Sequence, residues 1–358
     1  MTSLDDLPIR DDLRGLTPYG APQLDVAVRL NVNENAHRVP EHVALDIVQE
    51  IARALPDANR YPDREFDALR EAFARYLGHG LRPEQIWAGN GSNEVLQHVL
   101  QAFGGPGRSL LSFTPTYSMY PLLAQGVGMR WIAEPRAEDF TLSPEDVRRA
   151  IARHDPDVVF LCSPNNPTGT AIGLDVVEAA LEAVSGIVLV DEAYAEFAHD
   201  REQTALALLG DHPRLLVSRT MSKAFAFAGI RVGYLAAHPA VIDALRLVRL
   251  PYHLSALTQA AATAALRHAD AMLARVDDLR QQRDRIVAET SAMGLAPHPS
   301  DANFVLIGGI ADPHATFRAL LERDILVRDV GLPGTLRVTA GTEAETTALL
   351  AALSDLAA

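Results

Sequence analysis

The chain contains a single lysine, Lys223, in the segment TMSKAFAFAGIR (220–231). Every other basic side chain among the 32 Lys and Arg residues is arginine. Arginine stays protonated in proteins, whereas a lysine amine can lose its proton, attack a carbonyl and form a Schiff base. A lone lysine in such a chain therefore suggests chemistry that needs a primary amine. The alternative is a surface lysine retained by chance, and the other candidate residues decide between the two.

Three other segments carry polar residues that could form a site beside this amine. In GNGSNE (89–94), glycines and the free N–H groups of a helix start favour a phosphate, although Gly-Asn-Gly is also an ordinary turn. In SPNNPTGT (163–170), prolines hold Asn166 rigidly, so that its amide can donate to a phenolate-like oxygen. Asp191 closes the apolar run GIVLV and needs a cation such as a pyridinium nitrogen, unless it only caps a turn. Tyr194 could reach an adjacent ring oxygen.

Two residues flanking Lys223 complete a candidate cofactor site. Ser222 follows the strand pattern RLLVSRT, and Arg231 lies eight residues after Lys223, so both could hold the same phosphate. A phosphate site, a partner for a pyridinium, donors to a phenolate and a Schiff-base amine together form the set of groups that binds pyridoxal 5′-phosphate (PLP). PLP is therefore the predicted cofactor.

The elements around these segments predict an α/β fold. Apolar residues recur three and four apart at 41–55 and 64–77, as in amphipathic helices. Short apolar runs typical of buried parallel strands lie at 108–113, 157–162, 186–194 and 214–220. Strands alternate with helices, which indicates a doubly wound, mostly parallel sheet with its ligand at the carboxyl ends of the strands.

Changes in composition and in the pattern of helices and strands along the chain predict three regions. Residues 1–35, rich in Pro, Asn and Asp, are expected to form an extended N-terminal arm that packs on either domain. Residues 36–250 are expected to form the large domain that binds PLP. A helical stretch at about 255–290 then leads into short strands and further helices, so residues 251–358 are expected to form a smaller α+β domain.

Composition excludes several classes of protein. A net charge of −14 argues against a nucleic-acid or anionic-membrane partner. The one cysteine, Cys162, cannot form an internal disulfide, and the chain has no long apolar run or signal-peptide pattern, so a cytoplasmic location is expected. The twelve histidines show no metal-binding spacing, and no metal is predicted.

The motifs resemble those of a known enzyme family. SPNNPTG, VDEAY and SKAFAFAGIR, with Asp191 lying 32 residues before Lys223, resemble the fold-type I PLP-dependent aminotransferases. LNVNEN, NRYPD (59–63) and LRVTAGT are similar to the histidinol-phosphate aminotransferase branch. This resemblance implies transamination of histidinol phosphate with 2-oxoglutarate, as a step of histidine biosynthesis. An aromatic amino-acid aminotransferase and a threonine-phosphate decarboxylase are the alternatives on the same scaffold, and a PLP-binding regulatory module is a further one.

The resemblance also implies roles at the cofactor. Lys223 would form the Schiff base and then move the proton between Cα and C4′ of the substrate adduct. Asp191 would pair with the pyridine nitrogen, and Tyr117 would stack on the ring unless it is only a core aromatic. The other implied contacts are Asn166 and Tyr194 at the phenolic oxygen, and Ser92, Asn93, Ser222, Arg231 and Tyr61 at the phosphate. Tyr61 would come from the neighbouring subunit, which implies a homodimer.

Implied substrate contacts come from both ends of the chain. Arg337 in LRVTAGT matches the family arginine that receives a substrate anion, and Arg328 in ILVRD lies nine residues earlier. Two arginines can clamp a phosphate or a carboxylate, although Arg328 could equally be a solvated surface charge. Tyr19 and Asn33 resemble positions near the substrate.

Overall fold

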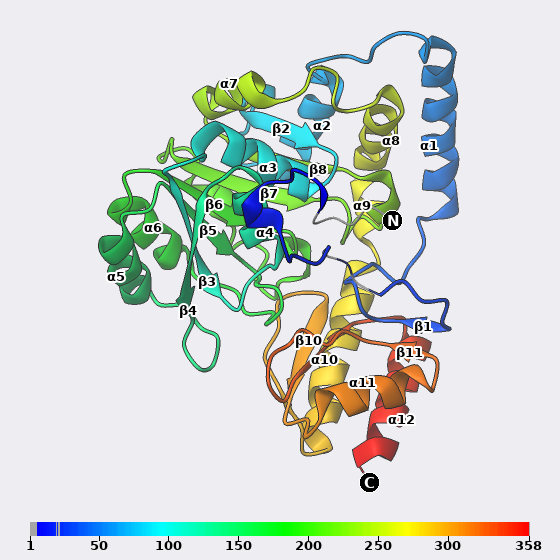
Figure 1. Cartoon of the computed structure of the whole chain (residues 1–358). Coiled ribbons are helices and arrows are strands. Elements are labelled where there is room, and N and C mark those ends of the chain that lie inside the picture. The colour runs from blue at the N-terminus through cyan, green and yellow to red at the C-terminus, as the bar shows by residue number, and fades with distance from the viewer. Residues whose placement is uncertain (1–5, 19, 21, 358) are drawn as a thin grey trace.

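The computed structural model describes residues 6–18, 20 and 22–357. The larger part of the molecule is built on a seven-stranded sheet in the order β2-β8-β7-β6-β5-β3-β4 (Figure 1). Its strands are β2 (Ile86–Gly89), β3 (Ser109–Thr114), β4 (Arg130–Pro135), β5 (Val158–Cys162), β6 (Ile187–Asp191), β7 (Leu215–Thr220) and β8 (Gly233–Ala237).

The strands of this sheet are mostly parallel. β4, β3, β5, β6 and β7 pair in parallel, whereas β8 runs antiparallel to both β7 and β2. All residues of β2, β5, β6 and β8 are buried, as expected for a sheet that is covered on both faces. The predicted α/β fold with a doubly wound, mostly parallel sheet is confirmed.

Amphipathic helices surround this sheet. They are α1 (Glu41–Ala54), α2 (Asp67–Leu77), α3 (Ser92–Phe103), α4 (Met119–Gly126), α5 (Pro144–His154), α6 (Leu174–Ala183) and α7 (Pro239–Val248). The capping pattern at SPED is formed, since the backbone N–H of Asp146 donates to Ser143 Oγ and Pro144 occupies the first position of α5. α5 packs against α6, and α3 packs against α7.

The helical stretch expected at 255–290 consists of three helices. They are α8 (Ala256–Arg267), α9 (Ala269–Leu273) and α10 (Val276–Ala292). α1 packs on α8 beside the large sheet rather than on its strands, and α8 also packs against α2. α10 packs against the last helix of the chain (Figure 1). The stretch therefore connects the two parts of the molecule.

The smaller part lies below the large sheet in Figure 1 and contains two small sheets. β9 (Ala296–Pro297), β10 (Phe304–Gly308) and β12 (Leu336–Thr339) form an antiparallel sheet in the order β12-β10-β9. β1 (Val28–Arg29) pairs in parallel with β11 (Ile325–Leu326), so the N-terminal segment packs on the C-terminal part of the chain. α11 (Pro313–Leu321) and α12 (Glu343–Ala357) complete this part.

Two hydrophobic cores correspond to the two parts. The larger core runs from Val43 to Phe304, and the smaller includes Leu30, Ile286 and Leu353. α10 contributes to both, because Leu279 belongs to the first core and Ile286 to the second. The predicted domain boundary near residue 250 stays a prediction.

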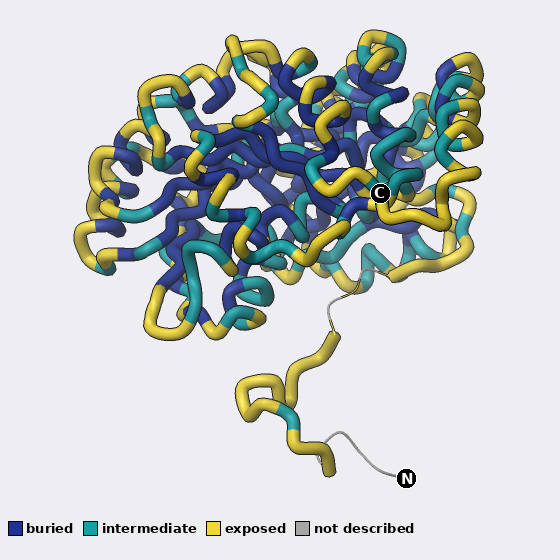
Figure 2. The backbone as a smooth tube through the Cα atoms, turned by 90° about the horizontal axis from the view of Figure 1, so that it is seen from above, coloured by how far each residue is buried: buried dark blue, intermediate teal, exposed yellow. Residues whose placement is uncertain are grey.

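The first described stretch of the predicted arm, residues 6–18, is almost wholly exposed and extends from the body (Figure 2). It touches the end of α4, where Arg10 Nη2 donates to the carbonyl of Gln125 at 2.9 Å. Among the described residues, none of the helices combines the length and the apolar character that crossing a bilayer requires.

Candidate active site

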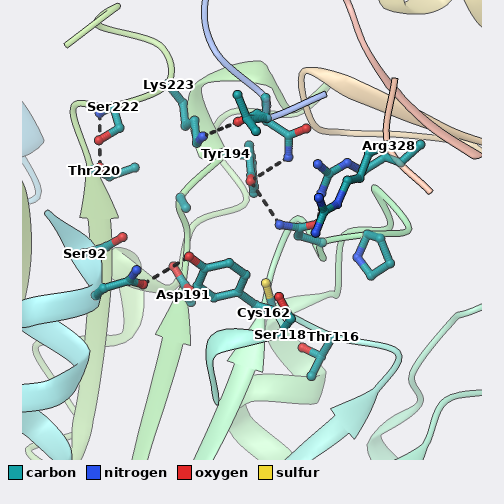
Figure 3. Close-up of a pocket in the computed structure, with 18 of the residues that line it drawn as sticks. Ser92, Thr116, Ser118, Cys162, Asp191, Tyr194, Thr220, Ser222, Lys223 and Arg328 are labelled. Atoms are coloured by element: carbon teal, nitrogen blue, oxygen red, sulfur yellow. Dashed lines mark hydrogen bonds between the residues drawn. The ribbon is translucent and has the colours of Figure 1, made fainter. Parts of the chain in front are cut away.

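A cavity of about 300 Å³ opens at the carboxyl ends of β5, β6 and β7 (Figure 3). It brings together nearly all the residues predicted for the site, from segments far apart in the chain. They are Asn33, Ser92, Asn93, Tyr117, Asn166, Asp191, Tyr194, Ser222, Lys223, Arg231, Arg328 and Arg337. Their convergence follows from the sheet, because parallel strands deliver the residues after them to one edge.

Lys223 lies three residues after the end of β7, and its side chain points into the cavity (Figure 3). Its Nζ donates to the carbonyl of Val32 at 2.9 Å. Burial, helped by the positive charge of Arg337, lowers the pKa of Lys223 to about 8. The amine can therefore lose its proton near neutral pH, as a nucleophile or a proton carrier must.

Asp191 ends β6 and is 3% exposed. Its Oδ2 accepts from the hydroxyl of Tyr120 at 2.8 Å, and its Oδ1 accepts from Ser218 Oγ at 3.3 Å. Burial raises the pKa of Asp191 to about 6, even though both hydrogen bonds favour the charged form. No ion pair to Asp191 forms within the described part of the chain, so a protonated ring nitrogen would suit this carboxylate.

Tyr194 and Asn166 line the cavity as a hydrogen-bonded pair. Tyr194 is buried, and its hydroxyl accepts from Asn33 Nδ2 at 2.9 Å and from Asn166 Nδ2 at 3.3 Å. Burial raises the pKa of this phenol, so it stays protonated. Because the oxygen already accepts two hydrogen bonds, its own O–H can be donated to a ligand oxygen.

The start of α3 has the features of an anion site. Gly91 precedes Ser92 with φ of 88°, and a methyl group built on it would overlap the guanidinium of Arg231. Glycine therefore lets Arg231 reach the N-terminus of α3, where free backbone N–H groups favour negative charge. Arg231 Nη1 lies 3.5 Å from Ser222 Oγ. This arrangement suits a phosphate.

Tyr117 contacts Asn93 at the start of α3 and Tyr120, which bonds Asp191. Its hydroxyl donates to Asn93 Oδ1 at 3.1 Å, and its ring meets the ring of Tyr120 edge-on with centroids 5.6 Å apart. Asn93 thus lines the cavity, and its amide oxygen accepts a hydrogen bond from Tyr117. Tyr117 lines the cavity and is only partly buried, so one ring face can meet a ligand.

Two arginines line the end of the cavity formed by the smaller part of the molecule. Arg337 is buried, and its guanidinium donates to Asn166 Oδ1 at 2.6 Å and to the carbonyl of Asn31 at 2.7 Å. Arg328 is held beside it, because the two residues exchange backbone hydrogen bonds. Two cationic side chains therefore face one ligand space.

Two predicted residues lie elsewhere. Tyr61 is 79% exposed and stacks on Tyr252, with ring centroids 4.4 Å apart, away from this chain's own cavity. Tyr19 lies outside the described residues.

Sequence reasoning missed several residues of the site. The missed residues that line the cavity are Asn31, Thr116, Ser118, Thr220 and Asp329. Tyr120 was also missed; it lies outside the cavity lining and donates a hydrogen bond to Asp191. A polar residue after a strand is a usable signal, and it could have identified Thr116 and Ser118 in FTPTYSMY. Tyr120 carries no such signal, because only the packing of α4 aims it at Asp191.

Comparisons with known proteins assign this architecture to a family. A family model described as aminotransferase class I and II matches residues 25–353. The chain therefore belongs to the class I and II aminotransferases.

Within that family, its place is among the histidinol-phosphate aminotransferases. It is 61% identical to the one from Paenarthrobacter aurescens, over 99% of this chain and 96% of the relative. It is 60% identical to that from Frankia casuarinae, over 98% and 90%. A solved structure of the Sinorhizobium meliloti enzyme in complex with PLP superposes with a TM-score of 0.81 at 28% identity, covering 93% of this chain and 91% of that one. The predicted family and enzyme class are confirmed.

Proposed function

We propose that this protein transfers the amino group of histidinol phosphate to 2-oxoglutarate, which yields imidazole acetol phosphate and glutamate. The relatives that carry the histidinol-phosphate name match almost the whole chain. The observation that carries the proposal is the cavity itself, in which one amine of lowered pKa lies between an anion site and two arginines.

PLP is the cofactor, as predicted, on the evidence of the family and of the PLP-bound relative. The residues present fit this group. The space at Gly91 that a methyl group would fill is used by Arg231, which creates a cradle for a phosphate. Asp191 is a buried carboxylate with no ion-pair partner among the described residues, and Lys223 supplies the amine.

Each residue has a defined task in the proposed mechanism. When bound, PLP supplies an aldehyde carbon and an electron sink for the charge that develops at the substrate Cα. Lys223 holds or releases a proton at Nζ, and its lowered pKa lets it do both near neutral pH. Asp191 keeps the ring nitrogen protonated, and Tyr194 and Asn166 donate to the phenolic oxygen. Ser222 and Arg231 hold the phosphate.

Arg328 and Arg337 are proposed to bind the anionic end of the substrate. Histidinol phosphate carries a phosphate and no α-carboxylate, whereas 2-oxoglutarate carries two carboxylates. A pair of guanidinium groups can accept either kind of anion. The hydrogen bond from Arg337 to Asn166 also links the substrate end to the proposed contact with the phenolic oxygen.

A homodimer is part of the proposal. Large apolar side chains are exposed on and just after α1, at and after the end of α7, and at Tyr252, which stacks on Tyr61. They are Leu45, Val48, Leu55, Leu247, Leu250 and Tyr252. Such residues in contiguous segments are typical of an interface. Tyr61 points away from its own cavity, and we infer that it completes the phosphate site of the partner. The cytoplasmic location stays a prediction.

The dimer is tested with a mixture of two inactive variants. Lys223→Arg lacks the amine, and Tyr61→Ala lacks the crossing side chain. Mixed dimers contain one site with both native residues, so we expect activity to recover on mixing, with sedimentation velocity giving a dimer mass. A monomer, or an active Tyr61→Ala protein, would contradict the shared site.

The activity is tested by coupled detection of glutamate formation from histidinol phosphate and 2-oxoglutarate, or its reverse. We expect turnover by the native chain and none by Lys223→Arg, which should remain folded but lack the visible absorption of lysine-bound PLP. Faster turnover of phenylalanine, or release of carbon dioxide without glutamate, would replace the proposal by one of its alternatives.

A further inference from the structure

Tyr120 connects two side chains that are proposed to contact the cofactor. It lies in the first turn of α4 and is fully buried. Its hydroxyl donates to Asp191 Oδ2 at 2.8 Å, whereas Ser218 Oγ lies 3.3 Å from the other carboxylate oxygen. Its ring edge meets the ring of Tyr117. One side chain that lines no part of the cavity therefore touches both Asp191 and Tyr117.

The surroundings of Tyr120 fix its orientation and its role as a donor. Its ring packs edge-on against Phe160 of β5, with centroids 5.2 Å apart. Burial raises the pKa of the phenol well above its ordinary value, so the hydroxyl stays protonated. The neighbouring thiol of Cys162 also stays neutral, because burial raises its pKa to about 12.

The other groups around Asp191 come from its own segment and from β7. Ser218 donates weakly from β7, and the backbone N–H of Ala193 also favours the charged form. Glu192 opposes ionisation of Asp191 by its negative charge, and Tyr194 and Cys162 are the further titratable groups nearby. Among these described neighbours, Tyr120 alone approaches from a helix and makes the short side-chain bond.

We propose that Tyr120 is a positioning residue, which fixes the Asp191 carboxylate for the cofactor's ring nitrogen and braces Tyr117 for the ring face. This inference rests on the proposed function only through the assignment of Asp191 and Tyr117 to the cofactor. Without the phenol, the carboxylate can rotate and is harder to ionise. PLP then binds more weakly, whatever the amino donor is.

The first test measures the affinity of the apoenzyme for PLP by absorbance and fluorescence titration. Removing one hydrogen bond to a charged group in Tyr120→Phe should weaken PLP binding about tenfold. Tyr76→Phe is the matched control, because the hydroxyl of Tyr76 also donates to a carboxylate, Glu196 at 3.2 Å, outside the cavity. The control should bind PLP as the native chain does. Native affinity in Tyr120→Phe would overturn the proposal.

The second test asks whether Tyr120 acts through Asp191. In an Asp191→Asn background, Tyr120→Phe should change PLP affinity by less than about twofold, since neighbouring residues that act together are not additive. The same loss in both backgrounds would overturn the positioning role and leave only packing. With Asp191 unchanged, PLP affinity should fall on acidification at a higher pH in Tyr120→Phe than in the native chain. The reason is that the loss of a hydrogen-bond donor raises the pKa of the carboxylate.

A third variant keeps the proposal testable if Tyr120→Phe fails to fold. Ser218→Ala removes the longer hydrogen bond to Asp191 and should weaken PLP binding by less than Tyr120→Phe does. If Tyr120→Phe does not fold, the expected loss in Ser218→Ala is still less than tenfold. A greater loss in Ser218→Ala would assign the positioning to β7 and overturn the role of Tyr120. These titrations use no substrate, so failure of the histidinol phosphate assay would leave their result intact.

Discussion

Burial acts in opposite directions on the two central ionisable residues of the site. It lowers the pKa of Lys223 to about 8 and raises that of Asp191 to about 6, because in each case the charged form loses hydration. The amine therefore exchanges its proton readily near neutral pH, and the carboxylate is favourably ionised once a cation is placed beside it. Both residues are poised for a ligand that combines a carbonyl carbon with a protonated ring nitrogen.

Adding a single methyl group at Gly91 should weaken PLP binding. In Gly91→Ala, the added carbon would displace the guanidinium of Arg231 from the start of α3, so we expect PLP binding to weaken about tenfold or more. Gly107→Ala is the matched control, because Gly107 has a φ of 85° against 88° at Gly91 but open space around its Cα. Both variants place an alanine at a positive φ, which is unfavourable for a residue with a Cβ. PLP titration compares the affinities of the two variants. Equal affinities would contradict a role of the Gly91–Arg231 arrangement in phosphate binding.

At the scale of elements, the sequence predicted the residues that follow the strands better than the residues that tertiary packing brings to the site. Asn166, Asp191 and Lys223 were identified because each lies in the few residues at or after a buried strand, where chain order alone determines the position. Tyr120 and Asn31 were missed, because they reach the site through tertiary packing of α4 and of the N-terminal segment. The antiparallel placement of β8 between β7 and β2 also has no local sequence signal.

The start of α5 gives a prediction for an element remote from the site. Ser143→Ala removes the acceptor for the backbone N–H of Asp146, and it should reduce the free energy of unfolding by about 1 kcal/mol. PLP affinity should not change, because α5 lines no part of the cavity. Urea unfolding and PLP titration of the same preparation measure the two effects. Ser143→Thr, which retains a hydroxyl as both donor to Asp146 and acceptor from its N–H, should recover most of the stability.

At the scale of the whole molecule, one buried arginine ties the two parts together. Arg283 on α10 is fully buried, and it donates to the carbonyl of Phe197 at 2.8 Å and to that of Ala302 at 3.3 Å. β1 adds a second tie, because the segment that follows it supplies Val32 and Asn33 to the cavity. The cavity is thus lined by the N-terminal segment, by residues that follow the strands of the large sheet, and by Arg328 and Arg337 of the smaller part.

That stability should depend on pH through a buried histidine cluster next to the large sheet. Burial lowers the pKa of His98 to about 4 and also lowers that of His253, which stacks on Trp87. In the unfolded chain both would titrate near 6.5, so the folded state loses stability as the pH falls from about 6.5 toward 4, by roughly 1–3 kcal/mol for His98. His98→Gln, which can still accept from Trp87 Nε1, should flatten this part of the urea-unfolding profile. His314→Gln, an exposed control on α11, should not, and an unchanged profile in His98→Gln would contradict the assignment.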